Sequence, residues 1–324
     1  MTDENKMGPP PAGMAAQAAI GDKHPDDPRC DAGTPDMVNF CCVLRGDWPF
    51  ERDEKIRRRM PELGVHYVEQ LYSGVSRYAP RNLPWRFVCF TDAARRIEGV
   101  PTRPLPEGLH GFFSKLYVFA PTAFPVGQRV VYLDLDTAIT GQLDDICRIP
   151  LEAPVALSNV WAPGHIGSGL LSFRAGKAVH RFWNDFEQCI GQGSPYSHPN
   201  PGKPPPRVPG TLCQWGPMGT GIRTDEQWLM NYAPWESFQK LLPGRLLSYK
   251  HEVIGAMIKH MRLPGPPPKP PGWDPRKENV MMVYFHGQPR PHTVVKPWNT
   301  IWRSVMDHPH IKVGQGFISE DWEG

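Results

Sequence analysis

The sequence predicts an α/β fold in which helices flank a mostly parallel sheet. Short apolar runs typical of buried strands alternate with segments whose apolar residues recur at helical spacing. The chain of 324 residues is long enough to bury a large core. Two strand-like runs are followed by residue types that can bind a metal ion, in Asp134-Leu135-Asp136 and at His286. Ligands of open α/β sheets lie beyond the carboxyl ends of the strands, so this edge is the expected site.

The first half of the chain predicts three strands joined by helices. The expected strands are apolar runs over 37–44, 86–90 and 130–137, and the expected helices cover 64–77 and 112–119. In 64–77 the apolar residues Val65, Val68, Leu71, Tyr72 and Val75 follow the helical period.

The second half continues the alternation. Strands are expected over 154–158, 170–173 and 280–285, the last as a strand of the core, and helices over 177–190 and 223–232. Thr224 is a typical helix cap with acids following it. Alone, Gly167-Ser168-Gly169 predicts a turn that enters a strand.

Proline sets the expected domain boundaries. Of the 39 prolines, 20 lie in three segments that cannot join a sheet interior. The organisation expected from them is a disordered leader (1–36), a folded domain (37–305) with Pro-rich surface inserts at about 197–217 and 263–275, and a C-terminal tail (306–324).

The composition excludes several classes of function. The net charge of +3 and pI near 8.4 are too mild for a nucleic-acid-binding protein. The seven cysteines include no CxxC pair, and Cys41, Cys42 and Cys89 lie in apolar runs, which favours buried reduced thiols. We see no membrane-spanning run and no secretory h-region, so a cytoplasmic protein is expected.

The acids Asp134 and Asp136 predict a metal site. They follow the apolar run Val130–Leu133, and side chains at i and i+2 of a strand face the same side. Two adjacent carboxylates repel each other, and hard oxygen ligands suit Mn²⁺ or Mg²⁺. A lone acid at a strand end more often caps a turn, but two acids after such a run favour a divalent cation.

A second candidate lies near the C-terminus, in Phe285-His286-Gly287-Gln288-Pro289-Arg290-Pro291-His292. His286 follows a strand-like run, and a neutral imidazole is a normal third ligand beside two carboxylates. His292 is a rival ligand. Arg290 offers a planar donor fork suited to phosphate oxygens.

Taken in order, these motifs resemble bacterial glycosyltransferases of the GT-A fold related to glycosyltransferase family 8. The similarity covers about 38–302. The matching elements are Tyr67-Val68-Glu69-Gln70-Leu71-Tyr72, Arg86-Phe87-Val88-Cys89-Phe90-Thr91-Asp92, Phe113-Ser114-Lys115-Leu116, Tyr132-Leu133-Asp134-Leu135-Asp136-Thr137, Ser168-Gly169-Leu170-Leu171, Asp225-Glu226-Gln227-Trp228-Leu229 and Phe285-His286-Gly287-Gln288-Pro289-Arg290-Pro291.

The resemblance implies a GT-A, Rossmann-like fold and a nucleotide-sugar transferase, with a UDP-sugar as donor and retention of configuration. It implies that Asp134, Asp136 and His286 hold Mn²⁺ or Mg²⁺ against the donor diphosphate. It further implies that catalysis, or contacts to the donor sugar, belong to Asp225, Gln227 and Lys115. Binding of the donor is implied for Leu44, Arg45, Lys115, Ser168, Gly169 and Arg290. The implied acceptor is a glycan, a lipid-linked group, a protein or a small molecule.

The chain departs from the family pattern in two places. Gly287 follows His286 directly, and Arg290 replaces a lysine while Lys296 follows later, so either cation is a candidate for phosphate. Gly167 stands where the family commonly has Asn.

Two other functions compete with this interpretation. A haloacid-dehalogenase-type phosphatase would use Asp134 as nucleophile and Asp136 as acid/base. Against it, strand-helix units precede the motif and Ala138 replaces the expected Thr or Val. The other alternative is a non-catalytic interaction protein on a glycosyltransferase scaffold.

Overall fold

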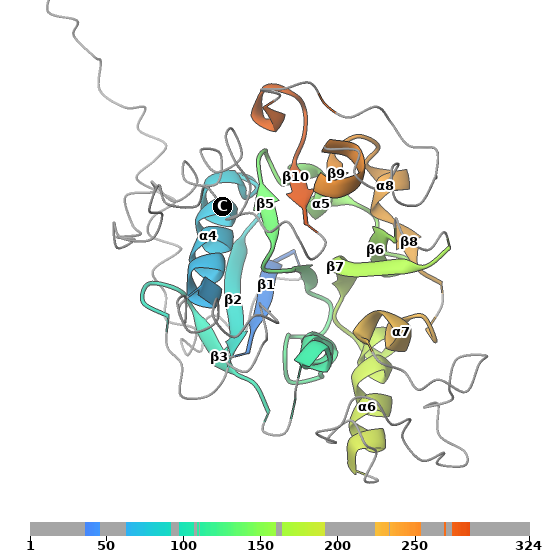
Figure 1. The fold of residues 1–324 in the computed structure, drawn as a ribbon. Helices are drawn as coiled ribbons and strands as arrows, with labels where there is room; N and C mark the ends of the chain where they lie inside the picture. Colours follow the sequence, from blue (N-terminus) through green and yellow to red (C-terminus); the bar gives the residue numbers. More distant parts are fainter. Residues whose placement is uncertain are drawn as a thin grey trace, which may run out of the picture.

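A seven-stranded sheet forms the centre of the described part of the protein (Figure 1). The computed structural model describes residues 36–45, 63–91, 97–106, 109, 111–159, 164–191, 224–232, 234–253, 269 and 274–285. The strand order is β3-β2-β1-β4-β7-β6-β8. The strands are β1 (Val38–Leu44), β2 (Trp85–Thr91), β3 (Thr102–Pro104), β4 (Arg129–Leu133), β6 (Val155–Ser158), β7 (Ile166–Arg174) and β8 (Glu236–Ser237).

The sheet is mostly parallel, as predicted. Only β7 runs against its neighbours: it pairs antiparallel with both β4 and β6, whereas the other pairings are parallel. In the register of β1 with β4, Cys41 lies opposite Tyr132. The carboxyl ends of β1 and β4 therefore lie at the same edge of the sheet, where Asp134 follows β4.

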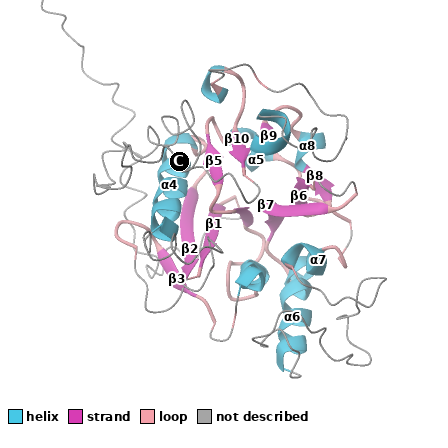
Figure 2. Ribbon diagram, in the orientation of Figure 1, coloured by secondary structure: helices cyan, strands magenta, loops and turns pink. Residues whose placement is uncertain are grey.

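Helices cover the sheet (Figure 2). They are α4 (Leu63–Tyr78), the 3-10 helix η1 (Gly111–Phe119), α5 (Asp144–Arg148), α6 (Lys177–Gly191), α7 (Asp225–Leu229), α8 (Phe238–Leu241), the π-helical turn η3 (Tyr249–Val253) and the 3-10 turn η4 (Pro275–Lys277). The predicted fold of a mostly parallel sheet flanked by helices is confirmed. Within the described ranges, no helix is long and apolar enough to cross a membrane.

The central strands are apolar on both faces because both faces are covered. In β1, Phe40 and Cys42 belong to the core on the α4 side, whereas Cys41 and Val43 belong to the core formed with η1, α6 and α7. This alternation explains why β1 is a continuous apolar run, a pattern typical of parallel strands. The predicted buried thiols Cys41, Cys42 and Cys89 are free and buried.

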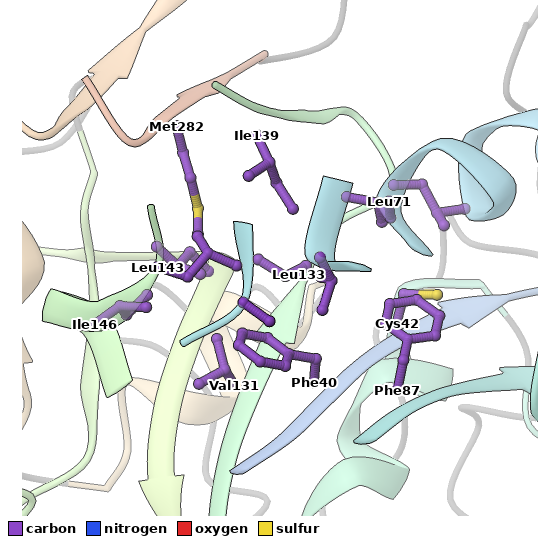
Figure 3. Close-up of a cluster of buried hydrophobic side chains, with 14 of the residues drawn as sticks. Phe40, Cys42, Leu71, Phe87, Val131, Leu133, Ile139, Leu143, Ile146 and Met282 are labelled. Carbon is purple, nitrogen blue, oxygen red and sulfur yellow. The ribbon is translucent and has the colours of Figure 1, made fainter. Parts of the chain in front are cut away.

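A second sheet of three strands, in the order β5-β10-β9, packs beside the first. Its strands are β5 (Thr137–Ile139), β9 (Leu246–Ser248) and β10 (Met282–Tyr284). Figure 3 shows Ile139 of β5 and Met282 of β10 in the same buried cluster as Leu133 of β4 and Leu71 of α4. The predicted core strand over 280–285 is confirmed as the shorter, buried β10, which pairs in the smaller sheet while Met282 and Tyr284 pack in the main core.

Several predicted elements have different limits in the structure. The region 112–119 is a 3-10 helix, and the helix expected over 223–232 is limited to Asp225–Leu229. The strand expected over 170–173 begins earlier, so Gly167, Ser168 and Gly169 lie within β7. Apart from Asp36, the leader lies outside the described residues, as do the insert at 197–217, most of 263–275 and the tail 306–324.

Candidate functional site

Asp134 and Asp136 lie in a turn at the edge of the main sheet. Strand β4 ends at Leu133, and the amide of Thr137 donates to the carbonyl of Asp134 at 3.1 Å, closing the turn from which β5 starts. The two acids are therefore not successive outward positions of one strand, and the alternation argument made from the sequence was wrong. Both side chains are nevertheless partly exposed while Leu135 between them is buried. The turn thus presents two carboxylates and anchors itself through Leu135.

Lys115 is a buried cation that joins three segments at this edge. It lies in η1, whose apolar residues pack on the sheet, and only 3% of its side chain is exposed. Its Nζ lies 3.3 Å from Asp134 Oδ2 and 3.1 Å from Asp225 Oδ2. It also donates to Ser168 Oγ at 3.0 Å. Side chains that are up to 110 positions apart in sequence therefore meet at one ammonium group.

The surrounding charges keep Lys115 protonated. Burial lowers the pKa of Lys115, but the negative charges of Asp134, Asp225 and Glu226 raise it more strongly, so its pKa lies above the ordinary value. A buried ammonium is tolerated only with such partners. The site therefore carries a permanent positive charge next to Asp134.

Tyr132 holds both Asp134 and Lys115. Its hydroxyl donates to Asp134 Oδ1 at 2.7 Å, and the Lys115 ammonium lies 5.3 Å from the centre of its ring. Burial and the neighbouring Asp134 carboxylate raise the pKa of Tyr132 well above its usual range, so the phenol stays a donor. Both oxygens of Asp134 thus have a fixed partner, Tyr132 on one and Lys115 on the other.

An irregularity in β7 shapes the next part of the site. The pairing of β6 with β7 shifts between Ala156 and Leu157, which leaves Ser168, Gly169 and Leu170 without an opposite residue on β6. The amide of Ser168 donates instead to Glu226 Oε1 at 3.2 Å, and the carbonyl of Gly169 accepts from the amide of Asp134 at 2.8 Å. The bulged strand thereby connects α7 to the acid pair.

The glycines of this strand lie in close contact with two carboxylates. A β-carbon on Gly169 would lie 3.6 Å from Asp134 Oδ2, and one on Gly167 would lie 3.9 Å from Glu226 Oε1. The buried side chain of Leu157 packs against both positions, since the same β-carbons would lie 3.5 Å from its Cβ at Gly167 and 3.6 Å from its Cδ1 at Gly169. Gly167 and Gly169 therefore let β7 pack closely against Leu157 and the two carboxylates.

The start of α7 supplies the remaining acids. Thr224 caps the helix by accepting from the amide of Gln227 at 3.2 Å, as its sequence predicts. Asp225 is 2% exposed and paired with Lys115, whereas Glu226 is half-buried and the Gln227 side chain is exposed. Burial and the neighbouring Asp225 raise the pKa of Glu226, and Lys115 opposes them. The sequence analysis gave Glu226 no role, because nothing in the motif distinguishes it from an ordinary first-turn acid.

The last described strand ends at the acid pair. The amide of Phe285 donates to the carbonyl of Asp136 at 3.2 Å, so the chain reaches the turn one residue before His286. His286, His292, Arg290 and Lys296 lie outside the described residues. At the same edge, Leu44 is the buried last residue of β1, and Arg45 follows it half-buried.

The donor set at the turn suits a hard divalent cation. Asp134 and Asp136 offer carboxylate oxygens, and Asp225 and Glu226 add negative charge nearby, which the ammonium of Lys115 partly offsets. Within the described ranges, no group of three or more His, Cys, Asp or Glu residues could hold a metal ion. A complete site therefore needs a ligand from another residue, donor or solvent.

Sequence and structure comparisons give the following picture. No protein-family model matches the chain, and no curated protein matches it. Similar solved structures include the glycosyltransferase GlyE of Streptococcus pneumoniae TIGR4, with 12% identity over 84% of this chain and 61% of that chain (TM-score 0.47). The bifunctional glycosyltransferase WbbM matches at 10% identity over 84% of this chain and 50% of that chain (TM-score 0.47).

An active-site mutant of LgtC matches at 12% identity over 82% of this chain and 94% of that chain (TM-score 0.47). Similarity of this degree assigns the chain to no family, and the function is argued below from the residues of the site.

Proposed function

We propose that this protein is a divalent-metal-dependent glycosyltransferase that moves a sugar from a nucleotide-sugar donor, a UDP-sugar, to an acceptor. The observation that carries the proposal is the meeting of Asp134, Ser168 and Asp225 at the buried ammonium of Lys115. This arrangement supports the proposal because it sets a fixed positive charge, paired with Asp225, next to the two acids proposed as metal ligands.

The residues divide into two functions. Asp134 and Asp136 are the proposed protein ligands of Mn²⁺ or Mg²⁺, and the proximity of Phe285 to Asp136 supports His286 as the third. When bound, such an ion supplies Lewis-acid stabilisation of the negative charge that develops on a departing diphosphate. Lys115 adds positive charge for the same group, and Arg290 or Lys296 is the proposed second cation.

The sugar lies next to the diphosphate in any nucleotide-sugar, and its proposed position is beside Lys115 and the start of α7, which meet Asp134 at this edge. Asp225 would orient Lys115. The two residues together would orient the sugar hydroxyls near the reacting carbon. Gln227, Leu44 and Arg45 stay proposed donor contacts, the last two for the nucleoside. Retention of anomeric configuration is proposed from the family resemblance alone.

Calorimetric titration with UDP, with and without Mn²⁺, tests the proposal. Wild-type protein is expected to bind UDP only when Mn²⁺ is present. The Asp134→Ala and His286→Ala variants are expected to stay folded by circular dichroism yet lose this binding. Asp144→Ala is the matched control, because Asp144 pairs with the exposed Arg148 within α5, and such a surface pair contributes little.

Wild-type binding in both the Asp134 and His286 variants would refute the proposed metal site. Failure of the wild-type protein to bind any nucleoside diphosphate with metal present would refute the transferase. Phosphomonoester hydrolysis that depends on Asp134 would then identify the phosphatase alternative, and no turnover would favour a non-catalytic scaffold. If UDP binds, NMR of donor hydrolysis across a panel of UDP-sugars identifies the donor and the configuration of the product.

A further inference from the structure

The side chain of Gln239 joins the large sheet to the small one. Its Oε1 accepts from the amide of Ser158 at 2.8 Å and from the hydroxyl of Ser237 at 3.3 Å. Its Nε2 donates to the hydroxyl of Tyr284 at 3.0 Å. Ser158 is the last residue of β6 in the large sheet, and Tyr284 is the last residue of β10 in the small sheet. One side-chain amide therefore links the carboxyl ends of two strands that belong to different sheets.

The position of Gln239 follows from the early end of β8. This strand pairs with β6 only through Glu236 and Ser237, because α8 begins at the next residue. The Gln239 side chain accepts from Ser158 where the backbone of a longer strand would have done so. Ser237 occupies the N-cap position of α8, yet its hydroxyl makes no cap and bonds to Ser158 and Gln239 instead. A preferred helix cap is thus given up for the contact between the two sheets.

Tyr284 carries this contact to the acid pair. It is buried and lies opposite Thr137 in the pairing of β10 with β5. The next residue, Phe285, donates its amide to the carbonyl of Asp136 at 3.2 Å. The end of β10 is therefore held by Gln239 on one side, and on the other it holds the turn that carries Asp136.

We infer that Gln239 is a positioning residue of the metal site, which fixes the end of β10 and, through it, the turn that carries Asp136. This inference rests on the proposed function, because it needs a metal ion at the acid pair. It goes further by giving a role to a residue of α8 that no motif of the sequence indicates. Gln239 acts on the position of a proposed metal ligand and is assigned no contact with the donor.

Gln239→Leu tests the inference, because it keeps a side chain of similar size and removes all three hydrogen bonds. The first measurement needs no metal ion. Hydrogen exchange of the Phe285 amide, followed by NMR, should become at least about tenfold faster, since its bond to Asp136 is held less firmly. The second measurement is a Mn²⁺ titration at saturating UDP. Loss of a group that orients a metal ligand costs about 10–100-fold in metal affinity, and we expect a loss of about tenfold. UDP affinity at saturating Mn²⁺ should stay close to that of wild type.

Tyr284→Phe removes only the hydroxyl that accepts from Gln239 and should reproduce both effects. The double variant Gln239→Leu/Tyr284→Phe should lose no more Mn²⁺ affinity than the weaker-binding single variant, because both changes break one contact. Gln239→Glu keeps the acceptor for Ser158, and its carboxylate can accept from the Tyr284 hydroxyl. It should therefore recover most of the Mn²⁺ affinity that Gln239→Leu loses. Gln188→Leu is the matched control, since Gln188 is an exposed glutamine of α6.

Each outcome has a distinct meaning. Unchanged exchange of the Phe285 amide or unchanged Mn²⁺ affinity in Gln239→Leu overturns the inference while the transferase proposal stands. Additive losses in the double variant do the same, because they would show that Gln239 does not act through Tyr284. If Gln239→Leu does not fold, Tyr284→Phe alone decides the inference by the same two measurements. Absence of Mn²⁺-dependent UDP binding in the wild-type protein overturns the proposed function itself and, with it, this inference.

Discussion

The amide of Phe285 donates to the carbonyl of Asp136 at 3.2 Å and thereby joins the end of the chain's last described strand to the acid pair. The contact is possible because β10 pairs antiparallel with β5, which starts directly after Asp136. The small sheet thus brings Phe285, the residue before His286 in the sequence, to the edge of the large sheet.

The close approach of β10 depends on Gly141. A β-carbon there would lie 2.7 Å from the carbonyl oxygen of Val280, a backbone atom. We expect Gly141→Ala to lower the free energy of unfolding by about 1–3 kcal/mol and to weaken Mn²⁺-dependent UDP binding. Urea unfolding and calorimetry measure the two effects. Gly176→Ala, whose β-carbon would make only an ordinary 3.9 Å contact with Val126, should cost less than about 1 kcal/mol. Equal effects of the two substitutions would contradict the prediction.

Removal of the buried ammonium should destabilise the fold. Lys115→Met leaves the buried Asp225 carboxylate without its partner, and we expect a loss of about 3–5 kcal/mol in urea unfolding. Because the pKa of Lys115 is raised in the folded protein, this contribution is fully present below about pH 10 and is lost only above it.

Two variants act as controls for this loss. The exposed Lys177→Met should change stability by less than about 0.5 kcal/mol. The double variant Lys115→Met/Asp225→Asn should recover part of the loss, because it removes the unpaired charge as well. No recovery would show that the pair with Asp225 is not the cause.

Loss of the Tyr132 hydroxyl should lower the affinity for the metal ion more than it lowers the stability of the fold. Tyr132→Phe keeps the ring beside Lys115 but removes the hydrogen bond to Asp134 Oδ1. Loss of a group that orients a metal ligand costs about 10–100-fold in metal affinity, so Mn²⁺ titration in the presence of UDP should show a decrease in this range. Tyr117→Phe, which removes only an exposed hydroxyl contact with Thr122, should bind as wild type does. Unchanged Mn²⁺ affinity in Tyr132→Phe would exclude a role in positioning Asp134.

Glu252 should make stability fall as pH rises through the acid range. Burial raises the pKa of Glu252 to about 7, above the value near 4.3 of an unfolded glutamate. Between these values the folded state binds the extra proton, so the free energy of unfolding decreases from about pH 4 to about pH 7.

Glu252→Gln removes this dependence and keeps an acceptor for the amide of Ser248. We expect the variant to exceed wild type by roughly 1–3 kcal/mol at pH 8 and to match it near pH 4. Exposed Glu236→Gln should not show this pattern. If the free energies of unfolding of wild type and Glu252→Gln differ by the same amount at every pH between 4 and 8, the prediction for Glu252 is contradicted.

The local pattern of apolar residues was sufficient to predict many of the strands and helices. The apolar runs of β1, β2 and β4 predicted buried strands because a strand covered on both faces has no polar positions. The helical period of 64–77 and the Thr224 cap were equally visible, since both depend on neighbouring residues alone. The position of Asp134 and Asp136 after a buried strand was likewise evident from the sequence.

What the tertiary structure decided depends on contacts between distant segments. The assignment of β10 to a second sheet follows from its pairing with β5 and β9, which no local pattern specifies. The meeting of Lys115 with Asp225 and the bond between Glu226 and Ser168 require the bulge in β7 and the packing of η1 and α7. The sequence by itself determined which strands are buried and where the acids lie, because burial periodicity is local. Only the folded chain decided which cation and which carboxylates share the site, because these side chains are brought together by long-range packing.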